Sequence, residues 1–339
     1  MLYNFLREGE KMIHTLYVYK EAFVNPYHNI ATEKRLLEKV QPGQCILYLW
    51  QNKNTVVIGR NQNPWVECRT TMLQEDGGFL ARRLSGGGAV FHDLGNLNFT
   101  FLVAEEDYNL DKQLSVIEKA CSYAGITATR SGRNDVLAEG CKFSGNAFYH
   151  SQGKAYHHGT LLVDVDMPNL GKYLTPSKSK LEAKGVASVR SRVINLRELS
   201  PALTVELMAA YMEKAFSDVY GGVPQATEFS QEDLDLIDRY QVKLSDWNWL
   251  YGQKLPFSFE CSQRFAWGEV TLQLQLASGH IEKTQVYSDS MDWSIAETLI
   301  NALTGCPFTL PAMCAATQNA FGDTDITRDI CEMLKKQDI

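Results

Sequence analysis

The chain has 339 residues, a length that fits one large domain or a large domain followed by a small one. Hydrophobic residues make up 45% of it and charged residues 22%, close to the globular average, which excludes a disordered chain. The net charge of −7 argues against nucleic acid as the main partner, because a negative protein is repelled by a phosphate backbone.

Nothing in the sequence indicates a membrane protein or a secreted one. No apolar run reaches the ~18 residues that span a bilayer, and residues 1–11 lack the apolar core of a signal peptide. We expect residues 1–11 to be a disordered extension and the protein to be cytoplasmic, with no membrane partner. The eight cysteines include no C-x-x-C pair and no zinc-ligand spacing, which fits a reducing compartment. No coiled-coil pattern occurs, so we expect a monomer.

The first half of the chain predicts alternating strands and helices. A strand pattern covers residues 15–19, and Asn29 is a candidate cap for a helix with apolar positions from Ile30 to Val40. Two strand patterns, residues 45–50 and 55–58, are separated by a polar turn and predict a hairpin. Apolar residues spaced by three and four between Leu110 and Ala124 predict a helix that Gly125 ends.

The second half predicts an antiparallel region and a separate small domain. Short strand patterns alternate with turns from residue 126 to 163, typical of a meander. Residues 172–197 are rich in lysine and arginine, and fit either a solvated loop with a short helix or a mobile basic flap over an anion. Beyond the break at 252–256, strand patterns at 270–276 and 281–287 precede a helix at 293–303. Residues 257–339 are therefore expected to form a small α+β domain.

Three glycines following two arginines form the most informative segment, Arg82-Arg83-Leu84-Ser85-Gly86-Gly87-Gly88. Successive glycines let backbone N–H groups approach an anion closely, and Arg83 can add a fixed cationic fork. The segment is neither a P-loop nor a dinucleotide fingerprint. A flexible turn is the alternative interpretation.

Two further segments carry candidate functional residues. Lys142 lies in a strand pattern between Gly140 and Gly145, either exposed on an edge or directed into a site. Cys141 precedes it, and we interpret this cysteine as a small filler because no base is evident beside it. His157-His158-Gly159 begins a strand whose glycine permits close backbone approach.

Together these segments resemble lipoate–protein ligase A of the two-domain bacterial type. The resemblance is carried by residues 50–65, 82–96, 132–147, 157–162, 184–196, 264–268 and 286–290, in family order and over nearly the whole chain from about Leu16. It implies a mixed-sheet α/β catalytic domain at residues 1–252, like that of biotin and lipoate ligases, and a small α+β C-terminal domain at 257–339. It also implies ATP-dependent activation of lipoate to lipoyl-adenylate, followed by transfer to a lysine of a lipoyl domain.

The resemblance also implies a set of site residues. Lys142 is expected to be catalytic, touching both the lipoyl carbonyl and the phosphate. ATP is expected against Arg83, Gly86, Gly87, Gly88, Ala89, Val90, Phe91 and Lys142, and lipoate against Lys142, Gly87, His92, Ala147, His158 and Gly159. Mg²⁺ is expected with the ATP; Asp135 could bind it or pair with a nearby arginine. For His92 and His158, turn or strand-end hydrogen bonding stays an equal alternative.

The implied partners are the lipoyl domains of 2-oxoacid dehydrogenase acyltransferase subunits and the glycine-cleavage H protein, with lipoate or octanoate as the small acid. Three other functions stay open. One is an ATP-independent octanoyl or lipoyl transferase on the same fold, against which the basic flap and the second domain argue. A biotin ligase lacks support, because its Gly-Arg-rich adenylate loop is absent. A non-catalytic lipoate-binding or carrier-docking protein would have no use for Lys142 and the glycine loop.

Overall fold

The computed structural model describes residues 13–132, 134–175, 193–252 and 257–337. Contacts divide the chain into two compact units. Unit 1 comprises Met1–Thr55, His92–Met167 and Ala187–Leu244, and unit 2 comprises Val56–Phe91, Pro168–Val186 and Ser245–Ile339. The expected extension at 1–11 and most of the expected basic flap lie outside the described residues.

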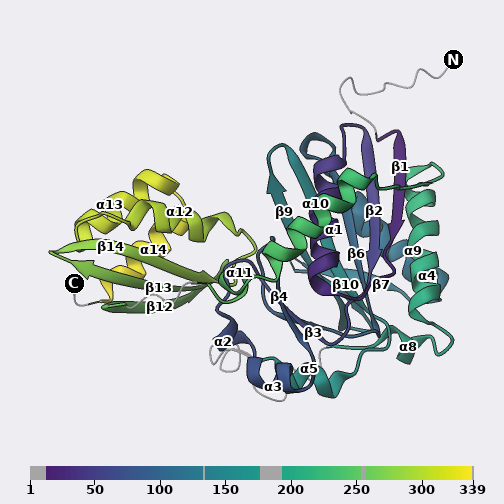
Figure 1. Ribbon diagram of the computed structural model, residues 1–339, viewed down its shortest axis with the longest axis horizontal. Coiled ribbons are helices and arrows are strands. Elements are labelled where there is room, and N and C mark those ends of the chain that lie inside the picture. Colours follow the sequence, from purple (N-terminus) through teal and green to yellow (C-terminus); the bar gives the residue numbers. More distant parts are fainter. Residues whose placement is uncertain (1–12, 133, 176–192, 253–256, 338–339) are drawn as a thin grey trace. The chain divides into compact units, whose positions relative to one another are not determined.

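Unit 1 is built on an eight-stranded mixed sheet (Figure 1). In spatial order the strands are β11 (Gln225–Ala226), β1 (Thr15–Lys20), β2 (Gln44–Trp50), β6 (Asn96–Ala104), β10 (Lys154–Leu162), β9 (Cys141–Ser151), β8 (Asp135–Ala138) and β7 (Ala128–Ser131). β1 pairs in parallel with β2 and β11, and all other neighbours are antiparallel. The expected mixed-sheet α/β fold and the antiparallel run β7–β10 are therefore confirmed.

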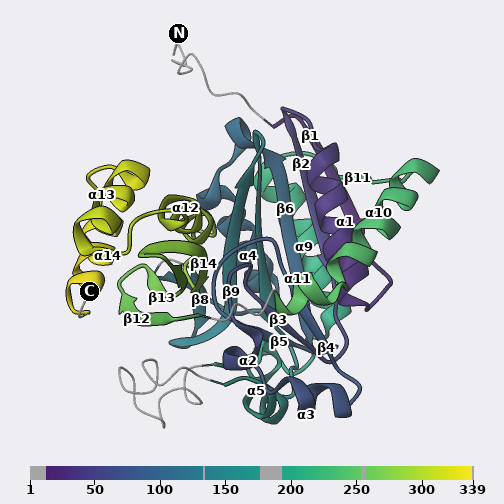
Figure 2. The same ribbon diagram turned by 60° about the vertical axis from the view of Figure 1, so that its left-hand side comes forward.

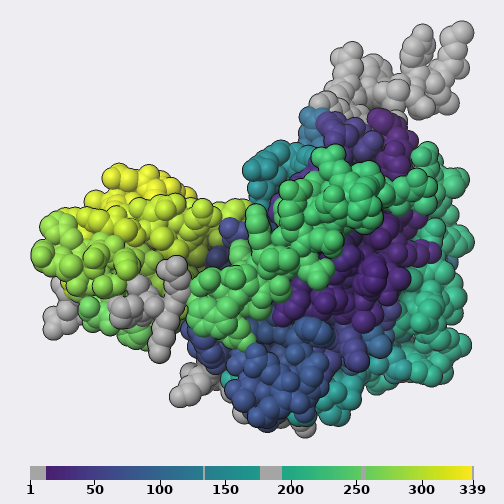
Figure 3. Space-filling model, in the orientation of Figure 1, coloured from purple at the N-terminus to yellow at the C-terminus, as the bar shows by residue number. Residues whose placement is uncertain are grey.

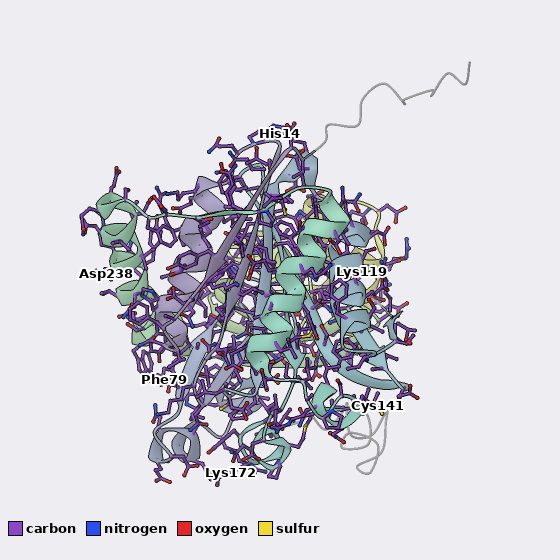
Figure 4. All side chains as sticks on the ribbon, turned by 90° about the vertical axis from the view of Figure 1, so that its right-hand side faces the viewer. His14, Phe79, Lys119, Cys141, Lys172 and Asp238 are labelled. Atoms are coloured by element: carbon purple, nitrogen blue, oxygen red, sulfur yellow. The ribbon has the colours of Figure 1, made fainter. Side chains whose placement is uncertain are left out.

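Helices cover both faces of this sheet. One face carries α1 (Pro26–Lys39) and α10 (Gln231–Leu244), and the other carries α4 (Leu110–Tyr123) and α9 (Val205–Tyr220). Figure 4 shows Asp238 of α10 and Lys119 of α4 on opposite sides of the sheet, and Figure 3 shows α10 lying across α1. Short helices η1 (Glu105–Asp107) and α8 (Leu196–Leu199) lie in the connections.

The hydrophobic core of unit 1 lies on the α4/α9 face. Leu47, Phe99 and Phe101 of the sheet are fully buried against Val116 and Phe216 of the two helices. Each such side chain contributes roughly 1.5–3 kcal/mol on burial. The opposite face, under α1, holds buried polar residues as well as apolar ones, and it carries several of the candidate site residues.

Two local predictions were wrong. The helix α1 begins one turn before Asn29, because Asn25 accepts hydrogen bonds from the backbone of Tyr27 and His28 and Pro26 occupies the first turn. The predicted hairpin also does not form: β2 is bonded on both sides, by β1 and β6, so no free edge remains for β3 (Thr55–Ile58).

Instead, β3 is the central strand of a small sheet between β4 (Phe79–Arg82) and β5 (Val90–His92). This sheet lies mostly in unit 2, with short helices α2 (Pro64–Glu67), α3 (Thr70–Glu75), α5 (Met167–Tyr173) and α11 (Trp247–Tyr251). The glycine segment connects β4 to β5.

The C-terminal part of unit 2 is a three-stranded antiparallel sheet with helices on one side (Figures 1 and 2). Its elements are β12 (Phe259–Phe265), β13 (Gly268–Ala277), β14 (His280–Ser288), α12 (Ser294–Leu303), α13 (Leu310–Phe321) and α14 (Asp325–Lys335). Alternate residues of β13, such as Val270 and Leu272, are buried against Leu299 of α12. The expected small α+β region is confirmed, while the boundaries at 252 and 257 stay a prediction.

Candidate functional site

Lys142 is the second residue of β9 in unit 1, after Cys141, which Figure 4 labels at the lower end of the sheet. Its Nζ lies 2.6 Å from Oδ1 of Asp135 on the neighbouring strand β8, and both side chains are about one-third exposed, at 34% and 37%. Asp135 thus has a lysine partner here. An ion pair this exposed contributes about 0–1 kcal/mol, so an incoming anion can replace the carboxylate at little cost.

The absence of a side chain at Gly145 leaves room for the side chain of Lys142. A Cβ at position 145 would lie 3.0 Å from Nζ and 3.1 Å from Cε of Lys142. The aliphatic part of the lysine therefore lies over bare backbone, where any other residue would crowd it. From the sequence, Gly145 was named only as the end of a motif. The contact could have been predicted from the spacing, because a glycine stands three residues after a lysine within one strand.

A buried polar row lies under α1. His158 Nδ1 lies 2.8 Å from Glu33 Oε1, to which Thr100 donates at 2.8 Å, and Trp50 Nε1 donates to the Thr100 hydroxyl at 3.2 Å. Glu33 is fully buried, and its Oε2 has no hydrogen-bond partner among the described residues. Ala147 pairs with His158 across the strands β9 and β10. Two predicted lipoate-binding residues therefore share this face.

His92, also expected to bind lipoate, extends the same row. Its Nδ1 lies 3.1 Å from Asn52 Nδ2, and its ring contacts Trp50 edge-on at 6.3 Å. Sequence reasoning did not select Glu33 and Trp50. Glu33 could have been identified as a buried polar residue, because it stands between the apolar positions Ile30 and Leu36 on the inward side of a helix.

Gly159 and His157 lie toward the opposite face. A Cβ on Gly159 would lie 2.7 Å from the Gly145 carbonyl oxygen, so this glycine permits close strand packing. Burial lowers the pKa of His157 to about 3, so the ring is neutral. Its Nε2 lies 2.7 Å from Asn146 Oδ1, and Asn146 donates at 3.0 Å to the carbonyl of Asn134, next to Asp135. His157 thus supports the hairpin that carries the ion pair.

In unit 2, Arg83 organises the glycine loop. Its buried guanidinium donates to the carbonyls of Gly86 (2.6 Å), Gly88 (2.8 Å) and Val57 (3.2 Å), and to the Ser85 hydroxyl (3.1 Å). Its expected contact with ATP stays a prediction. Ala89 and Val90 are half-buried and lead into β5, where Phe91 is buried.

The glycines of this loop accommodate a turn from the C-terminal sheet. Gly87 has φ +88°, and its N–H donates to the Ser290 carbonyl at 2.8 Å. A Cβ on Gly86 would lie 2.3 Å from the same oxygen and 2.6 Å from the Met291 carbonyl oxygen. Asn61 donates to the Trp293 carbonyl at 2.6 Å. Because Gly86 and Gly87 have no side chains, these two segments of unit 2 can come into close contact.

Arg82 has a structural role. Its guanidinium makes five hydrogen bonds to backbone carbonyls, those of Gly59, Arg60, Gln62, Trp249 and Leu250. Burial lowers its pKa to about 10. Arg82 therefore joins β4 to two other segments of unit 2.

The comparisons with known proteins fit this geometry. Residues 25–217, more than half of the chain, match the family described as lipoyl protein ligase A/B catalytic domain, and residues 254–336 match the bacterial lipoate protein ligase C-terminus. The chain belongs to the lipoate–protein ligase A family. It is 41% identical over 298 residues to lipoate-protein ligase A of Bdellovibrio bacteriovorus, covering 86% of this chain and 88% of that protein. With the Psychrobacter cryohalolentis protein of the same name it shares 40% over 296 residues, covering 85% and 87%.

Solved structures agree. P. falciparum LipL1, determined in complex with lipoate, has a TM-score of 0.83 and 26% identity, over 95% of this chain and 99% of that one. A lipoate-protein ligase A bound with ATP shares the fold, with a TM-score of 0.62 and 22% identity over 71% of this chain and 99% of that one.

Two properties of the described residues bear on ligands and membranes. They contain no group of three side chains placed to hold a metal ion. Nor do they include a helix of the length and apolar character needed to cross a bilayer.

Proposed function

We propose that the chain activates lipoate with ATP and transfers the lipoyl group to a lysine of an acceptor protein. In the first step a carboxylate oxygen of lipoate attacks the α-phosphorus, forming lipoyl-adenylate and releasing pyrophosphate. In the second step the acceptor lysine amine attacks the lipoyl carbonyl, an amide forms, and AMP leaves. The observation that carries this proposal is the accessible amine of Lys142, paired with Asp135, in a chain of the lipoate–protein ligase A family.

Lys142 supplies the charge that both steps need. The first step brings a carboxylate and a phosphate together, so a cation at their junction stabilises the transition state. The pair with Asp135 positions the lysine before substrate arrives, and its weakness lets the amine move to the substrate oxygens.

We propose that the lipoyl chain lies under α1, along the polar row and Ala147. Burying its four chain methylenes at about 0.8 kcal/mol each would contribute roughly 3 kcal/mol. The hydrogen bond from His158 to Glu33 places the imidazole beside that path. Gly87 and Gly159, the other expected lipoate contacts, are retained in the proposal as backbone positions.

The glycine loop, Gly86 to Phe91, is the proposed nucleotide-binding segment. Arg83 holds the loop by its carbonyls, and the Gly87 N–H is bonded to the Ser290 carbonyl, so we propose the N–H groups that follow Gly87 as phosphate ligands. Mg²⁺ would arrive with the triphosphate and neutralise phosphate charge. The carboxylate of Asp135 fits that role, because Mg²⁺ in such sites keeps one or two carboxylates and takes its other ligands from phosphate and water.

The acceptors we propose are lipoyl domains of 2-oxoacid dehydrogenase acyltransferase subunits and the glycine-cleavage H protein. Supporting this, one solved relative from Thermoplasma acidophilum is described as a bi-partite lipoate protein ligase with its E2 lipoyl domain; it shares the fold at TM-score 0.63 and 24% identity, over 72% of this chain and 99% of that one. Eight free cysteines fit a reducing compartment, so we propose a cytoplasmic location. We also propose a monomer, because no coiled-coil pattern occurs in the sequence.

Lys142→Ala, with Lys119→Ala of α4 as the control, tests the assignment. We expect pyrophosphate release from ATP and lipoate, measured without acceptor, to fall about 10²–10³-fold in Lys142→Ala and to stay unchanged in the control. Lys142→Arg should fail as well, because a planar guanidinium cannot replace a compact ammonium. Normal adenylate formation by folded Lys142→Ala would refute the role of this lysine. If the wild type transfers the lipoyl group without releasing pyrophosphate, the ATP-independent transferase is favoured instead. If neither reaction occurs, a carrier-docking protein is favoured.

A further inference from the structure

Large apolar side chains on two loops, and a lysine on a third, are exposed at one end of unit 1. Phe23 and Val24, between β1 and α1, are 62% and 36% exposed, and Leu94, between β5 and β6, is 51% exposed. Lys53, on the loop after β2, is exposed beside them. We call these four residues the rim.

Hydrogen bonds from α1 and from Gln51 hold the three loops together. The Asn29 amide donates to the Phe23 carbonyl at 3.1 Å and to the Gln51 carbonyl at 2.7 Å. Gln51 donates to the Leu94 carbonyl at 2.7 Å. The Lys53 N–H donates to the Val24 carbonyl at 3.1 Å. The rim is therefore a fixed surface, anchored on a buried asparagine.

The rim lies at the same end of the sheet as Lys142. β1 runs away from His14, which Figure 4 labels at the top, and its parallel neighbour β2 runs the same way, so both end at the bottom. β6 begins at that end, where Asn96 pairs with Leu162, the last residue of β10. β9 also begins there, with Cys141 labelled at the bottom in Figure 4.

The exposed charge of the rim is positive. Two carboxylates lie beside it: that of Glu21 accepts the N–H groups of Ala22 and Phe23 and lies 3.3 Å from His28 Nε2, and that of Asp93 accepts the N–H groups of Gly95 and Asp166. Lys53 has no ion-pair partner within the part of the chain that the structure describes. In a protein of net charge −7, an apolar surface with a free lysine favours a partner that is apolar and acidic.

We propose that the rim is the docking surface for the acceptor domain, whose surface around the target lysine would be apolar and acidic to match Phe23, Leu94 and Lys53. This rests on the proposed function, because transfer requires a folded protein to bring an amine to the end of the sheet where Lys142 lies. A small substrate needs no such surface. Contact of Phe23 and Leu94 with the partner would bury the exposed apolar area, and Lys53 would pair with an acceptor carboxylate.

The test uses a double variant, Phe23→Ser with Leu94→Ser, in the full chain. The matched control is Val223→Ser with Leu234→Ser, which removes exposed apolar side chains (86% and 41%) elsewhere in unit 1. Three rates are compared for proteins with unchanged melting curves: pyrophosphate release without acceptor, capture of lipoyl-adenylate by hydroxylamine, and lipoylation of an acceptor lipoyl domain. Hydroxylamine takes the lipoyl group without docking.

We expect the rim variant to keep the first two rates within twofold and to raise the KM for the acceptor at least tenfold, while the control changes none. Lys53→Glu should likewise slow only lipoylation, and most strongly at low salt. An unchanged acceptor KM overturns the proposal, and so does an equal loss of hydroxylamine capture, which would place these residues in the reaction site. Self-association that the rim variant abolishes would make a second copy the occupant instead. A wild type that forms no adenylate would refute the proposed function itself.

Discussion

Replacing the buried His157 by glutamine should change how the stability of the protein depends on pH. His157 is fully buried, and burial lowers its pKa from 6.5 to about 3. Below pH 6.5 the His157 ring therefore binds a proton in the unfolded chain, whereas in the folded chain it stays unprotonated down to about pH 3. The stability due to the neutral ring is complete above pH 6.5 and is lost as the pH falls from 6.5 toward 3.

The size of the effect follows from that interval. At about 1.4 kcal/mol per pH unit, folding becomes roughly 2 kcal/mol less favourable between pH 7 and pH 5 because of this one group. Glutamine cannot titrate and can still donate to Asn146. The free energy of unfolding of wild type minus that of His157→Gln, from urea titrations, should therefore fall by about 2 kcal/mol over that range. A difference that stays constant with pH would show that the ring is accessible to protons in the folded state.

Three further predictions concern the reaction. Gly86→Ala should impair adenylate formation while sparing transfer from synthetic lipoyl-adenylate, because its Cβ would meet the Ser290 carbonyl oxygen at 2.3 Å and displace the turn that holds the loop; equal loss in both half-reactions would contradict this. A chain ending near Gly252 should show the same pattern in the same two assays, and full adenylation without the C-terminal region would refute its role. Cys141→Ser should keep most activity, and a loss of transfer with adenylation intact would instead indicate a thioester intermediate.

The sequence predicted elements whose pattern is local. The helix α4 has a continuous apolar stripe and a glycine stop with φ +74°, and the strand β13 alternates from Gly268 to Gln275. Both were found because the signs lie within one segment. The antiparallel run ending in β10 was found for the same reason, since turns separate its strands.

Predictions that needed a partner distant in the chain were wrong or incomplete. The segment between β2 and β3 was predicted to be a hairpin turn, but both edges of β2 are hydrogen-bonded to other strands, β1 and β6. Arg83 was recognised as a cation near glycines, yet the direction of its guanidinium depends on the carbonyls that surround it. Glu33 was missed because its role depends on His158, 125 positions away.

The composition of unit 2 has a consequence for how the protein forms during synthesis. All segments of unit 1 have left the ribosome once Leu244 has emerged, whereas the segment Val56–Phe91 waits for partners that end at Ile339. At typical synthesis rates the remaining stretch takes on the order of 5–20 s. During that time the sheet of unit 1 that carries Lys142 can already be folded, while the glycine loop still lacks its contact with Ser290. If the glycine loop binds the nucleotide as proposed, nucleotide binding is the last step to become possible, so nascent chains are not expected to release reactive acyl-adenylate.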